Sequence, residues 1–155
     1  YIEYVLAFAS YINIKAKNQK KHNRETYHRW MDMGDVQTSE KHKFFHLRII
    51  RDIARLCPMV KFWLPTKEFS LLLAWDQAGY RMPGNVNVLI SNPMVDSEDV
   101  MRRWIDKKFQ HPELYGTTLV SSQGNHTCRA YDNKPTMCGS CDKCWTTKHV
   151  IYPLH

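Results

Sequence analysis

Residues 60–91 read VKFWLPTKEFSLLLAWDQAGYRMPGNVNVLIS, and they contain the clearest secondary-structure pattern of the chain. Its first part, Val60–Leu64, is an apolar run typical of a buried strand. A helix is predicted over Lys67–Ala78, with Gly79 as its stop. A second apolar run, Asn85–Ser91, then predicts another strand. Strand, helix and strand in this order indicate a parallel βαβ unit.

The same rhythm extends in both directions along the chain. Upstream, a strand predicted over Thr26–Met31 precedes a helix over Ser39–Leu56, whose first residue is a suitable N-cap. Downstream, a helix over Ser97–Phe109, also capped by its first residue, precedes a strand over Thr117–Ser121. The strand centres lie about 30 residues apart, the length of one strand-plus-helix unit. The predicted fold class is therefore α/β, a partial (half) parallel β/α barrel of about four βα units.

The chain of 155 residues is long enough for one domain with its own core. The predicted organisation is an N-terminal helix and basic linker (1–25), a parallel βα-repeat domain (26–122), and a cysteine-rich metal-binding tail packed on the same domain (123–155). Residues 1–14 predict an amphipathic helix, without the basic leader or cleavage site of a signal peptide. The apolar stripe of this helix is Ile2, Val5, Leu6, Ala9 and Ile12. Because the chain opens on Tyr1 rather than Met, we expect a longer precursor.

Four of the five cysteines lie within seventeen residues, with the spacing Cys128-x9-Cys138-x2-Cys141-x2-Cys144. Two residues between thiolates allow a tight turn to present both sulfurs to one ion or cluster. Four thiolates complete a tetrahedral zinc site or an iron–sulfur cluster. The fifth cysteine, Cys57, stands in apolar surroundings and is predicted to be a small buried hydrophobe. The pattern predicts a metal site built from the other four.

Three kinds of site compete for these four cysteines. Disulfides belong to oxidising compartments, and the packed spacing suits a metal better. Structural zinc commonly uses two Cys-x2-Cys pairs, or one pair with histidines, and His126 and His149 stand near the cysteines in the chain. The crowded run of three thiolates from Cys138 to Cys144 is typical of ferredoxin-type clusters. A [4Fe–4S] cluster is therefore the favoured cofactor, and zinc is the alternative.

Polar side chains follow each of the four predicted strands. They are Asp32 and Asp35; Thr66, Lys67 and Glu68; Ser91 and Asn92; and Ser121 and Ser122. In parallel α/β folds the C-terminal strand ends share one edge, where ligands bind. The candidate catalytic residues are Asp32, Asp35, Lys67, Glu68 and Ser91, with a carboxylate as acid or base and the lysine as an electrostatic clamp. Taken singly, Asp35, Ser91 and Asn92 are also explained as turn formers or helix caps.

The net charge is +7, and much of it lies between residues 15 and 29. The cations there are Lys15, Lys17, Lys20, Lys21, Arg24 and Arg29. Such a segment attracts phosphate backbones through the release of counterions, which predicts contact with nucleic acid or a nucleotide. A solvated linker is the alternative interpretation, because runs of charge commonly mark an exposed face. No apolar run approaches the ~18 residues of a membrane span, so no membrane partner is expected.

Four segments in a fixed order resemble a little-characterised bacteriophage family, the gene product 88 type. They are His28–Gln37 (HRWMDMGDVQ), Phe62–Glu68 (FWLPTKE), Asn85–Ser91 (NVNVLIS) and Cys138–Trp145 (CGSCDKCW), and the tail with Tyr152 and His155 agrees. Met31 and Met33 stand where the family has His and Ser. No role is therefore carried over to those two side chains, whereas Asp32, Gly34 and Asp35 match the family pattern.

The family's arrangement is similar to part of a radical-SAM half barrel. The resemblance to the phage family implies a phage protein that works in the cytoplasm of the infected bacterial host. The radical-SAM likeness agrees with an iron–sulfur protein. The Cys-x3-Cys-x2-Cys signature of radical-SAM enzymes does not occur in this chain. A radical-SAM reaction by these residues alone is therefore not expected.

Two functions follow from these observations. The first is an iron–sulfur protein acting on nucleic acid or nucleotides. The second is a non-enzymatic zinc- or cluster-stabilised module that binds nucleic acid or a host protein, with Tyr27, Trp30, Trp104 and Trp145 available for stacking. Core packing is the alternative role for these aromatic residues. It is favoured for Trp104, and also for Trp63. The sequence holds no Gly-x-Ser-x-Gly elbow, which disfavours a serine hydrolase, and it also holds no glycine-rich phosphate loop.

Overall fold

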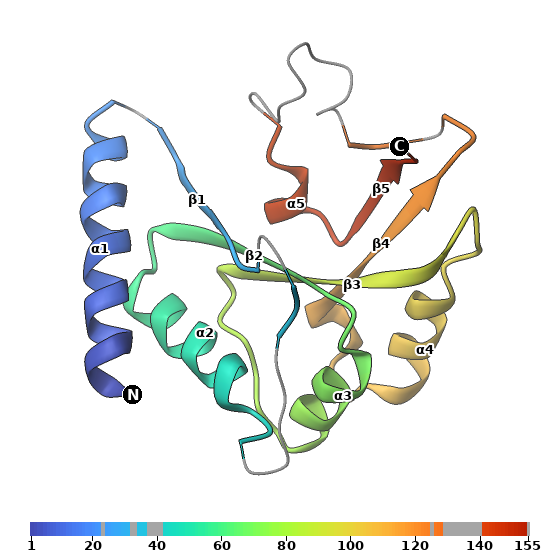
Figure 1. Cartoon of the computed structure of the whole chain (residues 1–155), viewed down its shortest axis with the longest axis horizontal. Helices are drawn as coiled ribbons and strands as arrows, with labels where there is room; N and C mark the ends of the chain where they lie inside the picture. The colour runs from blue at the N-terminus through green and yellow to red at the C-terminus, as the bar shows by residue number, and fades with distance from the viewer. Residues whose placement is uncertain (23, 32–33, 37–41, 125, 129–140, 155) are drawn as a thin grey trace.

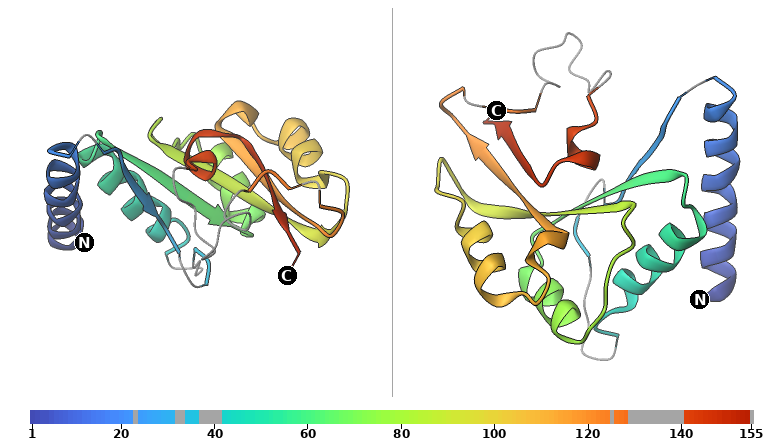
Figure 2. Two further views of the ribbon diagram at one scale, coloured as in Figure 1. Left: turned by 90° about the horizontal axis from the view of Figure 1, so that it is seen from above. Right: turned by 180° about the vertical axis from the view of Figure 1, so that it is seen from behind.

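The computed structural model describes residues 1–22, 24–31, 34–36, 42–124, 126–128 and 141–154. The elements are α1 (Ile2–Lys20), β1 (Thr26–Arg29), α2 (Phe45–Leu56), β2 (Val60–Thr66), α3 (Phe69–Gln77), β3 (Val86–Val95), α4 (Val100–Lys108), the 3₁₀ turn η1 (Pro112–Leu114), β4 (Tyr115–Ser121), α5 (Lys143–Thr146) and β5 (His149–Pro153). The strands form one parallel sheet in the order β1-β2-β3-β4-β5. This sheet curls into a half barrel, as Figures 1 and 2 show. The predicted α/β half barrel of parallel strands is thus confirmed.

Helices α2, α3 and α4 cover one face of the sheet, and α5 lies on the other face (Figure 1). Phe62, Val88 and Ile90 belong to the apolar cluster on the side of the larger helices. Trp63 and Leu89 belong to a second cluster, on the α5 side, which we call the inner face. Because both faces are covered, β2 and β3 are nearly continuous apolar runs.

The strand β5 lies beyond the four strands predicted from the sequence. It pairs with β4 from Thr117 opposite His149 to Ser121 opposite Pro153. The prediction of about four units therefore missed one strand of the sheet. Its centre, Val150–Tyr152, consists of strand-forming residues, but the apolar run is only three residues long and lies between histidine and proline.

Gly116 allows the chain that enters β5 to lie close against β4. A Cβ atom at this position would overlap the carbonyl oxygen of Lys148 and the side chain of Leu89. The neighbouring Thr117 N–H donates to that same Lys148 carbonyl over 2.8 Å. Glycine is therefore required here by close backbone approach.

Helix α4 is capped by Asp99, and the prediction of Ser97 as its cap was wrong. The Asp99 carboxylate accepts the Arg102 N–H at 2.9 Å, whereas the Ser97 hydroxyl donates to a carbonyl three residues upstream. Asp99 also accepts hydrogen bonds from the Asn92 amide and the Thr117 hydroxyl. Burial by itself raises the pKa of Asp99, but the hydrogen bonds from Thr117, Asn92 and Arg102 outweigh it and lower that pKa.

Helices α1 and α2 pack against each other. The buried residues of α1 are Val5, Ala9, Ile12 and Ala16. Ile2 and Leu6 of the predicted stripe are 69% and 52% exposed, which corrects that part of the prediction. Helix α2 begins at Phe45, and Ser39, its predicted cap, lies outside the described residues. Among the described helices, none combines the length and apolar character that a bilayer span requires.

Candidate functional site

Cys128 and Cys144 belong to the same buried cluster on the inner face of the sheet. Each is 7% exposed, and both belong to the apolar cluster that contains Trp63, Leu89 and Val150. The backbone N–H of Cys128 donates to a carbonyl of β5 at 3.0 Å. Two thiols from separate segments of the chain are therefore buried in one place.

Asn87 attaches the Cys144 segment to the sheet. Its side-chain amide donates to the carbonyl of Cys144 at 2.9 Å and to that of Thr147 at 2.7 Å. These two carbonyls belong to the short helix α5 and the residue that follows it. Asn87 is itself buried. Asn87 was not among the site residues predicted from the sequence, although a polar side chain that alternates with valines in a buried strand is the signal that would have identified it.

Tyr152 lies beside the two thiols. Its hydroxyl is 3.2 Å from the Cys144 sulfur. Burial raises the pKa of Tyr152 far above its ordinary value, and the negative charges of Cys144 and Cys128 raise it further. The phenol therefore stays protonated and can donate a hydrogen bond to a thiolate.

The described residues supply part of the predicted metal site. Cys141 is partly exposed just before α5, and Cys138 lies outside the described residues. Within the ranges that the structure describes, no three His, Cys, Asp or Glu side chains are grouped to hold a metal ion. The donor chemistry of buried thiols suits zinc or an iron–sulfur cluster. The fit is partial, because two of the four predicted ligands share one location.

Cys57 and His149 both lie outside the cluster that contains Cys128 and Cys144. Cys57 is fully buried with its sulfur 3.5 Å from the carbonyl of Ala9, and burial raises the pKa of its thiol. Its prediction as a buried hydrophobe is confirmed. His149, considered as a zinc ligand, instead places Nδ1 3.1 Å from the Asp99 carboxylate and 3.1 Å from the Thr117 hydroxyl.

Asp35, in the segment that follows β1, is hydrogen-bonded to the end of β2. Its carboxylate accepts the backbone N–H of Lys67 at 2.6 Å and the hydroxyl of Thr66. The same Thr66 oxygen accepts the N–H of Glu68 at 3.0 Å. Asp35, Lys67 and Glu68 are therefore neighbours, and Asp35 holds them through backbone and hydroxyl hydrogen bonds.

Ser91 lies at the same edge of the sheet. Thr66 pairs with Ile90, so Ser91 is one residue beyond that pair. On its other side Ser91 pairs with Thr118, whose hydroxyl donates to the Ser91 hydroxyl at 3.2 Å. Asp32, another catalytic candidate, lies outside the described residues. The structure thus brings the described catalytic candidates to one edge of the sheet.

The predicted nucleic-acid contacts divide between two places. Lys15, Lys17, Lys20, Lys21 and Arg24 lie on α1 or in the connection from α1 to β1. Lys17, Lys20 and Arg24 line a cavity of about 480 Å³. Lys61 also lines this cavity, and its ammonium pairs with the Glu25 carboxylate at 2.8 Å. This end of α1 is a concentrated positive surface.

Arg29, the sixth predicted contact, lies on the inner face. Its guanidinium carbon is 4.7 Å from the centre of the Trp63 ring. Trp145 packs edge-on against Trp63 at 5.4 Å and lies 5.1 Å from the ring of Tyr27. Trp63 is therefore buried as predicted, whereas Trp104 is 45% exposed, which contradicts core packing for that ring.

Comparison with known proteins yields one family. A family model described as Gene product 88 matches residues 3–147, which is most of the chain. No curated protein and no solved structure matches. The matched range includes α1 and extends through α5, so the basic segment and all four clustered cysteines fall inside it.

Proposed function

The chain belongs to the bacteriophage-associated Gene product 88 family, and we propose that it is a thiolate-ligated metal protein that contacts nucleic acid or nucleotides. Cys128, Cys138, Cys141 and Cys144 hold the metal in this proposal, with a [4Fe–4S] cluster as the first choice and zinc as the alternative. The proposed place of action is the cytoplasm of the infected bacterial host. When bound, a cluster supplies electron transfer or an iron site, whereas zinc supplies a structural cross-link.

The joint burial of Cys128 and Cys144 is the observation that carries this proposal. A single buried cysteine is commonly an apolar packing residue. Here two thiols from separate segments are buried in one cluster, and one segment is attached by the paired hydrogen bonds of Asn87. The Tyr152 hydroxyl beside the Cys144 sulfur is the kind of outer partner that orients a metal ligand.

The positive surface at the end of α1 supports contact with phosphate. Lys17, Lys20 and Arg24 converge on one cavity, although they are up to seven residues apart in the chain. Lys61 joins them from β2 and neutralises Glu25, the carboxylate that would repel an anion there. Clustered cations of this kind bind nucleic acid mainly through its backbone.

One observation favours the binding module over catalysis. The Asp35 carboxylate accepts hydrogen bonds from Thr66, Lys67 and the adjacent Val36 N–H, so it serves to fix the segment after β1 to the end of β2. A general base needs a lone pair within reach of the proton that it removes, and these three bonds occupy most of the acceptor capacity of the carboxylate. We therefore propose binding as the primary role, and catalysis at the strand ends as a role that requires a ligand to rearrange Asp35.

The test is the metal content of cysteine variants purified without oxygen. We expect Cys144→Ser to lose most of the iron or zinc, because it removes a ligand beside Tyr152. The matched control is Cys57→Ala, since Cys57 is buried elsewhere and should leave the metal content unchanged. Equal metal content in Cys144→Ser and the unmodified protein would overturn the proposal, as would an unmodified protein that contains no metal.

A further inference from the structure

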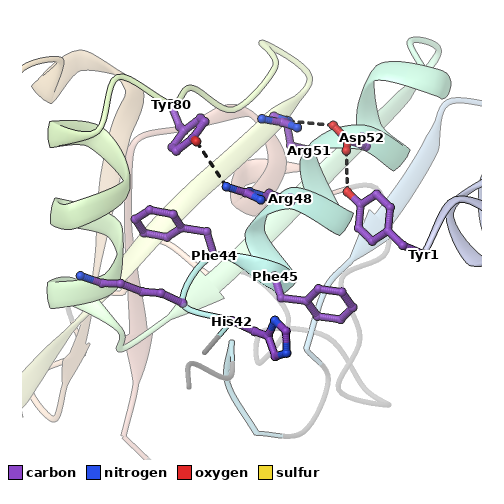
Figure 3. A pocket seen from close by; sticks show the side chains of 9 residues that line it. Tyr1, His42, Phe44, Phe45, Arg48, Arg51, Asp52 and Tyr80 are labelled. Atoms are coloured by element: carbon purple, nitrogen blue, oxygen red, sulfur yellow. Dashed lines mark hydrogen bonds and ion pairs between the residues drawn. The ribbon is translucent and has the colours of Figure 1, made fainter. Parts of the chain in front are cut away.

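A cavity of about 660 Å³ lies at the start of α2 (Figure 3). It was not predicted from the sequence. Its lining comes from the first residue of the chain, from residues 42–52 and from the segment after α3. The cavity volume falls within the range of about 300–1,000 Å³ that is usual for small-molecule sites. It combines cations with aromatic rings.

Arg48 lies between the Tyr80–Phe44 side of the cavity and the Tyr1–Phe45 side (Figure 3). Its guanidinium donates one hydrogen bond to the Tyr80 hydroxyl at 3.3 Å. Among the described residues, no carboxylate forms an ion pair with Arg48. Because a guanidinium has five N–H donors, most of them are available to an anion.

The neighbouring Arg51 shows the contrast. Its Nε lies 2.7 Å from the Asp52 carboxylate, which also accepts the Tyr1 hydroxyl at 2.5 Å. At that end of the cavity the positive charge of Arg51 is therefore neutralised by the Asp52 carboxylate. The positive charge offered to a ligand is therefore concentrated at Arg48, which lines the cavity.

The start of α2 adds to this positive potential. The helix has no acidic residue in its first turn, and its N-cap, Phe44, provides no side-chain hydrogen bond. The N-terminal end of a helix carries a partial positive charge, although the first N–H of α2, that of Phe45, already donates to the His42 carbonyl at 3.0 Å. Together with Arg48, this end of α2 favours a phosphate group.

Aromatic rings form the other part of the cavity. Phe44 packs edge-on against Tyr80, with ring centres 5.6 Å apart. On the other side Phe45 is 42% exposed and lies 5.9 Å from the Tyr1 ring. Exposed rings beside cations are the surfaces on which nucleobases stack.

We propose that this cavity binds a nucleoside phosphate, with the phosphate at Arg48 and the base against the rings of Phe44, Phe45 or Tyr80. The nucleoside phosphate is either a free nucleotide or one nucleotide of a single-stranded nucleic acid. Among the residues that the structure describes, the cavity shares no lining residue with the cysteine site or with the positive surface of α1. Its ligand therefore does not depend on the metal.

The experiment is titration calorimetry of the full chain with ATP, AMP, adenosine and a short oligothymidine strand. We expect Arg48→Ala to weaken nucleotide binding by about ten- to a hundredfold, the usual effect of losing a charge-assisted hydrogen bond. Arg103→Ala is the matched control, because Arg103 is an exposed arginine of α4 outside the cavity. Phe45→Leu should weaken binding about tenfold through lost stacking. Circular dichroism checks that each variant is folded, and Arg48→Lys retains the charge as a second, milder variant.

The outcomes separate the sources of the ligand. Binding of ATP or AMP that depends on Arg48 identifies a free nucleotide, and strand binding that depends on Arg48 identifies a nucleic-acid unit. The cavity proposal is overturned if none of these probes binds, or if Arg48→Ala binds as tightly as the unmodified protein. The metal content of the Cys144→Ser variant tests the cysteine site, and Arg48-dependent binding tests the cavity. A loss of metal without a change in Arg48-dependent binding would show that the two sites act separately.

Discussion

Replacement of Asn87 by alanine tests how the fold holds the cysteine segment. The Asn87 amide donates to the carbonyls of Cys144 and Thr147 at 2.9 and 2.7 Å. Alanine removes both donors and leaves the Cys144 carbonyl in a buried environment without its side-chain partner. The change removes little apolar surface, so the lost hydrogen bonds dominate its effect.

The expected loss of unfolding free energy follows from the two bonds. A hydrogen bond contributes about 0.5–1.5 kcal/mol net, and a buried polar group left unpaired costs about 1–3 kcal/mol. The Thr147 bond is only part-buried, so water replaces some of it, whereas the bond to Cys144 is buried. We therefore expect Asn87→Ala to destabilise the protein by about 2–4 kcal/mol. This is a large share of the stability of a domain, which is typically about 5–15 kcal/mol.

The assay combines urea unfolding with mass-spectrometric measurement of thiol labelling. Asn87→Ala should lower the unfolding midpoint and accelerate labelling of Cys144 in native buffer. Asn18→Ala is the matched control, because Asn18 lies on the exposed side of α1 and should change stability by less than about 0.5 kcal/mol. A loss smaller than about 0.5 kcal/mol for Asn87→Ala, or unchanged Cys144 labelling, would refute the anchoring role.

Further perturbations test the sheet, helix α4 and the positive surface. Gly116→Ala should lower the unfolding free energy by about 1–3 kcal/mol because its Cβ meets the chain entering β5, whereas Gly84→Ala has open space and should stay near the unmodified value in urea unfolding. Hydrogen bonds lower the pKa of Asp99, so its contribution is complete above the ordinary aspartate pKa and is lost as pH falls through the lowered value. Unfolding measured across acidic pH should show this loss, and Asp99→Asn should flatten it; an equally steep profile would contradict the assignment. Lys17→Ala and Lys20→Ala should each reduce the salt dependence of DNA binding by about one unit of slope in fluorescence anisotropy, and an unchanged slope would exclude contact at α1.

The architecture was predictable because the sheet is buried on both faces. Phe62 and Val88 lie in apolar runs bounded by turn residues, and helical segments separate these runs. Such a pattern depends on local sequence, so the parallel order of the strands followed from it. The strand β5 was missed because its pairing depends on Gly116 of β4, a contact between distant parts of the chain.

The candidate site was predictable only in its chemistry. The spacing of Cys141 and Cys144 indicated thiolate ligation, but it could not show that Cys144 shares a buried cluster with Cys128. The cavity beside Arg48 was not predicted, because Tyr80 reaches it from another segment and Arg48 looks like an ordinary solvent-facing residue of an amphipathic helix. Convergence of distant side chains carries no local sequence signal.

The most direct test of the metal site is the visible spectrum of the protein purified without oxygen, together with the iron, sulfide and zinc content per chain. We expect broad absorption near about 400 nm with about four irons and four sulfides per chain, as a [4Fe–4S] cluster requires. About one zinc per chain without iron would assign the site to the structural alternative. A colourless protein that contains neither metal would contradict the proposal that these cysteines are metal ligands.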